Sequence, residues 1–345
     1  KRQVAGLTAP TDPLGPERFL AELEGTAPAA LLARLRACWQ QPIDLASCLD
    51  GPDGLIRLHA DGGGRVWIPG ETRAMAGRLD PLVRLARLAA ELTPWRTGQR
   101  SFALQVHDEE PSDPAALRLD APAGLASPQH GGIPDPYCLG SRGYLLFRQA
   151  MAADPPPPWQ QRRPVVIWRG ATTGSRAITP ARLGANPRVR LCEHSRRWPE
   201  RLDARITSVV QCRDGEAQQA VTCELEGRGL LAPVLEPLQM AQYRWIVDID
   251  GNVNSWGLLW KLLSGSCVLR VSSSRGQWYH HRLQPWRHLV PIRVDLADLD
   301  QQLDWCFAHP DACAAIAAEG QRLALQVLDD LGADLLTALR WSLES

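Results

Sequence analysis

The second half of the chain alternates between short apolar runs and segments with helical spacing, and this alternation restricts the fold more than any other feature. The apolar runs are short and rich in Val, Ile, Leu and Trp, as in buried strands. The predicted strands are Pro164–Trp168, Arg188–Cys192, Tyr243–Asp248, Cys267–Val271 and Leu289–Ile292. The predicted helices are Trp256–Leu263, Leu296–Ala308 and Asp311–Ser345. Strands that alternate with helices predict an α/β fold with a doubly wound parallel sheet.

The first hundred residues combine helical patterns with a β-hairpin. Helical spacing covers Pro16–Gln40 and Glu71–Leu92. Leu55–His59 and Arg65–Pro69 flank a glycine-rich turn, which predicts two strands joined by a hairpin. Ser101–Val106 is apolar and predicts a further, buried strand.

Four consecutive prolines, Pro155–Pro158, form the clearest linker in the sequence. Such a run is stiff and extended, unlike the interior of a helix or strand. A chain of 345 residues also exceeds the usual size of a single hydrophobic core. We therefore expect an N-terminal domain over residues 1–153 and a C-terminal domain over residues 154–322. A C-terminal helix over residues 323–345 could pack back on the N-terminal domain.

Charge and cysteine usage exclude several classes of partner. The 38 basic and 38 acidic side chains cancel, so no overall field favours nucleic acid. No apolar run approaches the ~20 residues that span a bilayer, so we expect at most peripheral membrane contact. The nine cysteines are scattered singly, without a CxxC pair. Their odd number favours a reducing compartment, and we expect a bacterial cytoplasmic protein.

Polar clusters follow three of the predicted strands. His107-Asp108 follows the strand Ser101–Val106. Arg169–Arg176 follows Pro164–Trp168, and Asp250–Trp256 follows Tyr243–Asp248. Ligands of open parallel sheets bind outside the carboxyl ends of the strands, where such clusters lie.

The cluster after Trp168 combines small residues, hydroxyls and two arginines. Gly170 allows close backbone approach, Thr172 and Thr173 offer hydroxyls, and Arg169 and Arg176 offer forked donors. These are the groups that bind phosphate. An ordinary turn has a similar composition, so this cluster alone does not distinguish a phosphate-binding loop from a turn.

The cluster after Asp250 leads into a predicted helix. Asn252, Asn254 and Ser255 precede it, and Asn and Ser are good helix caps beside an anion-binding N-terminus. Both clusters together favour a nucleotide diphosphate. Neither contains a Walker loop, and no GxGxxG follows a strand.

Three segments, in order, resemble the signatures of glycosyltransferase family 90. This family includes protein O-glucosyltransferases, fungal capsule xylosyltransferases and bacterial lipopolysaccharide glycosyltransferases. The segments are Trp168–Gly174, Tyr243–Trp256 with Lys261–Leu269, and Gln284–Leu299. The resemblance covers about half of the chain, from Trp168 to Gly320. A weaker upstream match rests on Val106–Asp108 and Ile133–Tyr137.

The resemblance implies a GT-B fold, in which two Rossmann-like doubly wound domains face a central cleft. It also implies inversion at the anomeric carbon, a UDP-sugar donor, no cofactor and no metal. Asp108 matches the general base, and Arg176 matches the arginine that binds the diphosphate. The stretch Asn252–Gly257 matches the nucleotide-binding segment. Within it Trp256 offers a stacking surface, as Trp168 does on the other side.

Other positions leave alternatives open. Asp135 and Tyr137 match the acceptor side, although Asp135 stands between two prolines and also fits a rigid turn. Some family members carry an arginine where this chain has Gly257. Lys261, one helical turn further on, could supply the missing cation or could lie on a solvated helix face.

Rival functions also remain at this point. Asp248-Ile-Asp250 spells DxD, which binds manganese in other glycosyltransferases. A non-catalytic nucleotide-sugar or glycan-binding protein, or a different nucleotide-dependent enzyme such as a sulfotransferase, would share some features. The interpretation favoured by the sequence is an inverting, metal-independent glycosyltransferase. It would move a hexose or pentose from a UDP-sugar to a hydroxyl acceptor, such as a bacterial surface glycan or lipopolysaccharide.

Overall fold

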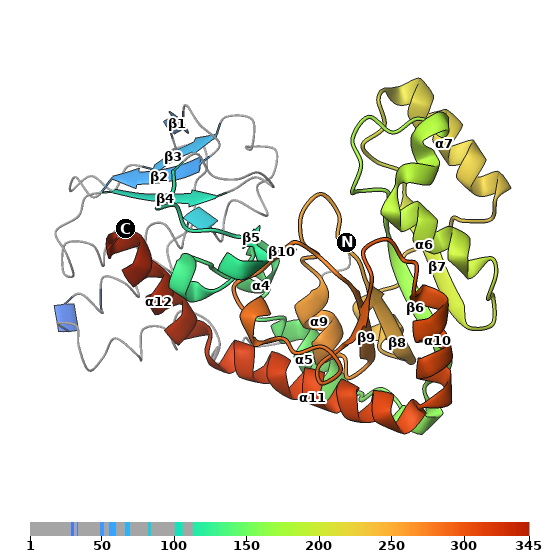
Figure 1. Ribbon diagram of the computed structural model, residues 1–345. Coiled ribbons are helices and arrows are strands. Elements are labelled where there is room, and N and C mark those ends of the chain that lie inside the picture. Colours follow the sequence, from blue (N-terminus) through green and yellow to red (C-terminus); the bar gives the residue numbers. More distant parts are fainter. Residues whose placement is uncertain are drawn as a thin grey trace. The chain divides into compact units, whose positions relative to one another are not determined.

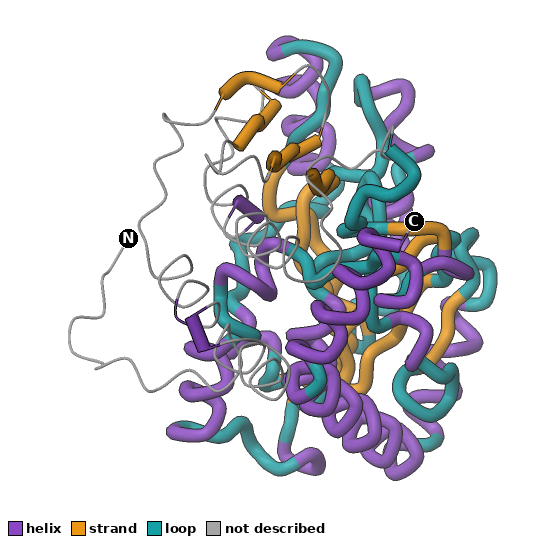
Figure 2. The backbone as a smooth tube through the Cα atoms, turned by 90° about the vertical axis from the view of Figure 1, so that its left-hand side faces the viewer, coloured by secondary structure: helices purple, strands orange, loops and turns teal. Residues whose placement is uncertain are grey.

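The computed structural model describes residues 113–344 continuously (Figure 2). Before them it describes the segments 29–30, 33, 49–51, 55–59, 66–69, 82–83 and 101–105. The chain divides into two compact units. Unit 1 comprises Lys1–Ala121, Leu125–Leu145 and Val327–Ser345. Unit 2 comprises Pro122–Gly124 and Leu146–Gln326.

Unit 2 is built on a five-stranded parallel sheet (Figure 1). The strands are β6 (Arg163–Ala171), β7 (Leu202–Ser208), β8 (Tyr243–Asp248), β9 (Cys267–Val271) and β11 (Val290–Ile292). Their order is β11-β9-β8-β6-β7, and every neighbouring pair is parallel. This sheet confirms the predicted α/β class. It also confirms the strands expected at residues 164–168, 243–248, 267–271 and 289–292.

Helices and short turns connect these strands. The longer helices of this part are α5 (Leu145–Ala153), α6 (Pro187–Ser195), α7 (Gly215–Gly227), α10 (Leu299–Ala308) and α11 (Pro310–Asp329). The shorter elements are η5 (Trp159–Gln161), η6 (Pro180–Ala185), α8 (Pro237–Met240), α9 (Leu258–Leu263), β10 (Arg275–Gly276) and η7 (His280–Arg282).

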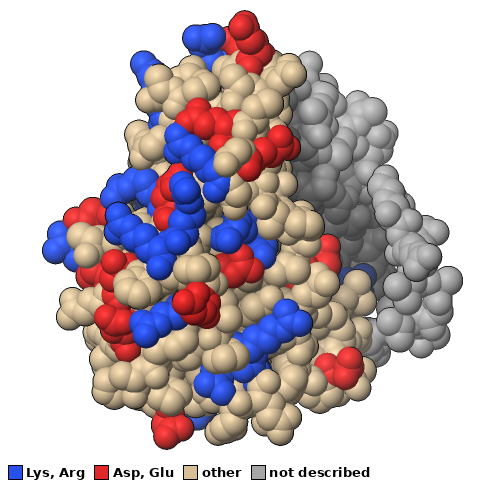
Figure 3. Space-filling model, turned by 90° about the vertical axis from the view of Figure 1, so that its right-hand side faces the viewer, with Lys and Arg blue, Asp and Glu red and all other residues tan. Residues whose placement is uncertain are grey.

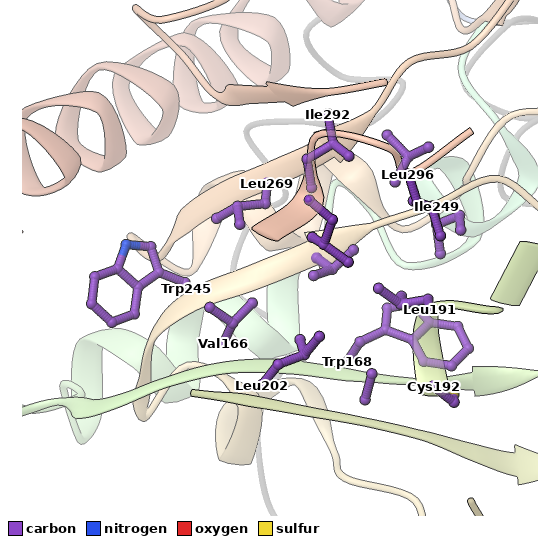
Figure 4. Close-up of a cluster of buried hydrophobic side chains, with 14 of the residues drawn as sticks. Val166, Trp168, Leu191, Cys192, Leu202, Trp245, Ile249, Leu269, Ile292 and Leu296 are labelled. Carbon is purple, nitrogen blue, oxygen red and sulfur yellow. The ribbon is translucent and has the colours of Figure 1, made fainter. Parts of the chain in front are cut away.

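Alternate residues along the strands pack against different helices. Val166 and Trp168 belong to the main core cluster, which also holds Leu191 of α6 and Leu299 of α10 (Figure 4). Ile167 belongs to a second cluster, against which Trp260 of α9 packs. Because successive side chains of a strand point to opposite faces, α6 and α9 cover opposite faces of the sheet.

The strand predicted at Arg188–Cys192 is wrong, because these residues lie within helix α6. Pro187 occupies the first turn, and the Asn186 side chain accepts hydrogen bonds from the backbone N–H groups of Arg188 (3.0 Å) and Val189 (3.1 Å). Such an N-cap followed by proline begins a helix. The second strand of the sheet is instead β7, which the sequence analysis did not identify.

The predicted tail is helical, but it is divided into α10, α11 and α12 (Leu331–Glu344). The chain passes from unit 2 to unit 1 within α11. Within unit 1, α12 packs on η4 (Pro128–His130), where the Trp341 ring would collide with a Cβ atom at Gly131. Ser342 Oγ donates to the Ala115 carbonyl at 2.8 Å.

The described strands of unit 1 form a mixed sheet of order β1-β3-β2-β4. They are β1 (Leu49–Gly51), β2 (Leu55–His59), β3 (Val66–Pro69) and β4 (Ser101–Gln105). β2 and β3 are antiparallel neighbours, which confirms the predicted hairpin strands. The remaining elements are β5 (Ala121–Pro122), η3 (Ala123–Leu125) and α4 (Pro136–Gly140). The helices predicted over residues 16–40 and 71–92 lie mostly outside the described residues.

Acidic and basic side chains are interleaved on the side of unit 2 that carries α6, α7 and α10 (Figure 3). Two of the ion pairs there join Arg201 to Asp304 (2.7 Å) and Arg228 to Glu193 (3.0 Å). This face therefore carries no extended patch of one sign. Among the helices that the structure describes, none is long and apolar enough to span a bilayer.

Candidate functional site

The strand order of unit 2 places a topological switch point between β6 and β8. From β6 the chain continues outward to β7, whereas from β8 it continues to β9 on the other side. In open α/β sheets, ligands bind at the carboxyl ends of the strands where two connections leave in opposite directions, as they do here. The loops at this position are two of the three polar clusters predicted from the sequence, Arg169–Arg176 and Asp250–Trp256.

These two loops contact each other directly. The backbone N–H of Gly174 donates to Oδ1 of Asn252 at 3.2 Å. Gly174 has a φ of +103°, which side-chain-bearing residues rarely adopt. A Cβ atom at Gly251 would lie 2.8 Å from Thr173 Oγ1, so glycine is required for this approach. The structure therefore brings both predicted clusters together.

Several residues of the first loop have structural partners. The Thr172 hydroxyl is bonded to both the carbonyl and the N–H of Val210, at 2.8 Å each. Arg169 pairs with Asp203 of β7 at 2.7 Å. A Cβ atom at Gly170 would come within 2.6 Å of the Trp168 ring. These contacts fix the end of β6.

Of the residues predicted in this loop, Thr172 is buried, Thr173 is half-buried and Arg176 is exposed. The expected stacking role of Trp168 is wrong, since its side chain is only 2% exposed and belongs to the core.

Behind the second loop lies a buried ionic network centred on Asp248, the last residue of β8. The Asp248 side chain is fully buried. Its Oδ1 accepts from Lys261 Nζ and from Ser255 Oγ, both at 2.6 Å, and its Oδ2 accepts from Arg270. Burial alone would raise the pKa of Asp248, but Lys261 and Arg270 lower it well below its ordinary value.

Asp250 belongs to the same network. Its Oδ1 accepts from the Ser255 N–H at 3.0 Å and forms an ion pair with Arg270 at 2.9 Å. Burial raises the pKa of Asp250, and Arg270 opposes this shift. The guanidinium of Arg270 thus lies between the two carboxylates, and Ser255 is bonded to both of them.

This geometry corrects two expectations about the second loop. Asn254 and Ser255 do not cap the following helix, because α9 begins at Leu258 and the Ser255 hydroxyl is directed to Asp248. A solvated position for Lys261 is wrong too, since the residue is only 7% exposed and is paired with Asp248.

Arg188 of α6 joins the ends of β6 and β8, although the sequence analysis had assigned it no role. Its Nε donates to the Asp250 carbonyl (2.9 Å), and its terminal nitrogens donate to the carbonyls of Ala171 (3.2 Å) and Ile249 (3.1 Å). Burial lowers its pKa to about 10, while Asp248 and Asp250 oppose this shift. The guanidinium therefore stays charged at neutral pH.

The other predicted site residues lie elsewhere or outside the described residues. Asp108 falls in the segment 106–112, outside the described residues. Asp135, in unit 1, is buried and caps α4, accepting from the N–H groups of Tyr137 (2.9 Å) and Cys138 (3.0 Å). These hydrogen bonds support the interpretation of Asp135 as a residue of a rigid turn. Tyr137 is exposed, and Trp256 is half-buried.

Two sequence signals could have identified the residues that were missed. Arg270 is a charged residue inside the apolar run Cys267–Val271, and a charge at such a position requires buried partners. Asn186-Pro187 marks a helix start, which would have placed Arg188 in the first turn of α6.

Comparison with known families matches residues 142–331, more than half of the chain, to glycosyl transferase family 90. The chain belongs to this family. The match begins just before α5, ends at the first residue of α12, and includes both loops of the switch point. It confirms the resemblance on which the sequence analysis relied.

One of the similar proteins is Uncharacterized protein 035R of Invertebrate iridescent virus 3. It is 32% identical over 50% of this chain and 16% of its own length. Protein O-glucosyltransferase 3 of Homo sapiens is 28% identical over 44% of this chain and 28% of its own length. The chain therefore spans less than a third of the length of either relative.

A solved structure, that of Anabaena Alr3699/HepE in complex with UDP-glucose, matches with a TM-score of 0.36. The sequences are 13% identical, over 57% of this chain and 51% of that one.

Proposed function

We propose that this family 90 chain is an inverting, metal-independent glycosyltransferase of GT-B architecture. It transfers a hexose or pentose from a UDP-sugar to a hydroxyl acceptor, and a bacterial surface glycan or lipopolysaccharide is the acceptor we favour. The observation that carries the proposal is the switch point of unit 2, where two glycine-containing loops meet above buried cations. Such a crevice suits the diphosphate of a nucleotide-sugar.

The proposed reaction is a single in-line displacement. Asp108 takes the proton of the acceptor hydroxyl as its oxygen bonds to the anomeric carbon. The bond from that carbon to the diphosphate breaks at the same time, and the nucleoside diphosphate leaves from the opposite face. Arg176 and Lys261 stabilise the charge on the leaving group.

The network around Asp248 supports metal independence. A DxD site needs carboxylate oxygens that are available to a cation. Here Arg270 already lies between Asp248 and Asp250, and Lys261 neutralises Asp248 from another side. A metal ion would have to displace these buried partners, so we propose that fixed cations replace it.

Lys261 is also well placed to substitute for the arginine that some family members carry at position 257. A Cβ atom at Gly257 would lie 3.5 Å from Lys261 Nζ and 2.9 Å from Trp260 Nε1. The amine therefore occupies the space beside position 257. In this chain, Lys261, one turn further along, takes the place of the arginine that other members carry at position 257.

A cytoplasmic location fits the state of the thiols. Cys192, Cys267 and Cys306 are buried and form no disulfide, as in proteins of reducing compartments. A donor made in the cytoplasm and an acceptor on the path to the cell surface fit this location.

The first test measures donor binding and transfer in excess EDTA. We expect one or more UDP-sugars to raise the melting temperature, because a ligand that binds only the folded state stabilises it by mass action. We expect transfer or slow donor hydrolysis to proceed unchanged in EDTA. Differential scanning fluorimetry with a panel of UDP-sugars, followed by release of UDP, measures both.

The matched control adds manganese after the chelator has been removed. Activity that disappears in EDTA and returns with manganese would establish the DxD mechanism instead. Donor binding without transfer to any acceptor, and without hydrolysis, would favour a non-catalytic binding protein. Failure to bind any UDP-sugar would contradict the proposed function itself.

Arg176→Ala tests the diphosphate contact. We expect it to weaken UDP binding by ~1.5–3 kcal/mol, the contribution of a charged hydrogen bond. Isothermal titration calorimetry with UDP measures this effect. The control is Arg182→Ala, which removes another exposed arginine a short distance further along the chain, in η6. Equal UDP affinities for both variants would show that Arg176 does not bind the diphosphate.

A further inference from the structure

We infer that Arg188 is a positioning residue that gives the crevice its net positive charge and thereby selects a diphosphate. For the identity of the nucleotide this inference rests on the proposed function, but for the charge of the ligand it does not. It starts from the position of the guanidinium, which donates to Ala171 at the end of β6 and to Ile249 and Asp250 just after β8.

The three contacts cross the switch point. Ala171 belongs to the strand that leads into the first loop, and Asp250 begins the second loop. One rigid, planar group therefore fixes the separation of both loops. The same loops meet again at Gly174 and Asn252. The ring of Trp168 lies below the guanidinium at 5.7 Å and limits its movement on that side.

The charges of the cluster do not cancel. Asp248 and Asp250 carry two negative charges, and their ion-pair partners Lys261 and Arg270 carry two positive ones. Arg188 adds a further positive charge, and the hydrogen bonds of its guanidinium to the described residues go to neutral backbone carbonyls. The cluster formed by these five side chains therefore has one excess positive charge.

An excess buried charge costs folding free energy unless a counterion compensates it. At the mouth of an α/β crevice, its natural counterion is an anionic ligand. In a site of low dielectric, a positive charge acts on a phosphate several ångströms away without touching it. The neighbouring loop residues can then form the direct contacts, while Arg188 sets the potential and the loop spacing.

Two substitutions separate the effect of the positive charge of Arg188 from its effect on the spacing of the loops. Arg188→Gln keeps an amide donor for the carbonyls but removes the charge, whereas Arg188→Lys keeps the charge but loses the planar fork. The ligands are UDP, inorganic pyrophosphate and uridine, of which uridine carries no phosphate. The control is Arg190→Gln, on the same helix, because Arg190 donates to the backbone carbonyl of Asp295.

Calorimetry should show that Arg188→Gln lowers the affinity for UDP and for pyrophosphate by about 10-fold or more, as expected for a loss of charge stabilisation. Uridine affinity should change by less than about 3-fold. Arg188→Lys should bind UDP within about 3-fold of the wild type, and Arg190→Gln should match the wild type.

Equal losses for UDP and uridine would overturn the inference, because Arg188 would then act only as a scaffold. Unchanged affinity for pyrophosphate would overturn it as well. If Arg188→Gln does not fold, pyrophosphate binding by the wild type still decides, since absence of that binding excludes a charged anion site. A wild type that binds pyrophosphate but no UDP would contradict the proposed function and leave the role of Arg188 intact.

Discussion

Asp108→Asn is expected to lower the rate of sugar transfer by about 100-fold or more while leaving UDP affinity unchanged. The substitution removes the proton acceptor but keeps the size and polarity of the side chain, so it affects the chemical step rather than donor binding. Product formation at saturating UDP-sugar measures the loss, and calorimetry with UDP measures the retained affinity.

Glu109→Gln is the matched control, since it removes a neighbouring carboxylate in the same segment. It should transfer sugar at close to the wild-type rate. A fully active Asp108→Asn variant would place the base elsewhere. Asp135, which the resemblance places on the acceptor side, is a poor replacement because its buried carboxylate caps α4.

Asp248→Asn is expected to lower the free energy of unfolding by ~3 kcal/mol or more. It leaves Lys261 buried without the charge that compensates it and leaves Arg270 paired with Asp250 alone, and an orphaned buried charge is strongly destabilising. Urea denaturation at pH 7 measures the change. The pKa of Asp248 is depressed in the folded state, so its stabilisation is present at pH 7 and declines as the pH falls below about 4. The difference between the variant and the wild type should therefore shrink in acid.

The control for this prediction is Asp304→Asn. Asp304 forms an ion pair with Arg201, but its side chain is 67% exposed, and an exposed pair contributes at most about 1 kcal/mol. If both variants lost the same small amount, the Asp248 network would not stabilise the fold as described.

The sequence predicted those strands whose signal lies within one apolar run. Tyr243–Asp248 and Cys267–Val271 were predicted with the observed bounds, because both are buried along almost their whole length. β7 was missed although Leu202, Ala204 and Ile206 alternate with polar residues and are buried. As the sheet edge, it has the weaker, alternating pattern of a half-buried strand.

Site prediction succeeded where a rule connects sequence to space. The carboxyl ends of parallel strands lie at one edge, so the loops after β6 and β8 could be expected to meet. No such rule shows that Arg188 of helix α6 and Arg270 of strand β9 lie beside Asp248 and Asp250. That arrangement depends on register and helix packing, which a single sequence does not reveal.

The backbone groups at the two edges of the parallel sheet determine whether copies of the chain can pair strand to strand. An unpaired strand edge is a template for strands from another copy of the chain. At one edge, β11 has only three residues, and its central Pro291 has no N–H to donate. At the other edge, Ile206 of β7 is already bonded to the backbone of Leu230 and Ala232. Neither edge therefore offers a long ladder of free backbone groups, which protects the sheet against edge-to-edge aggregation.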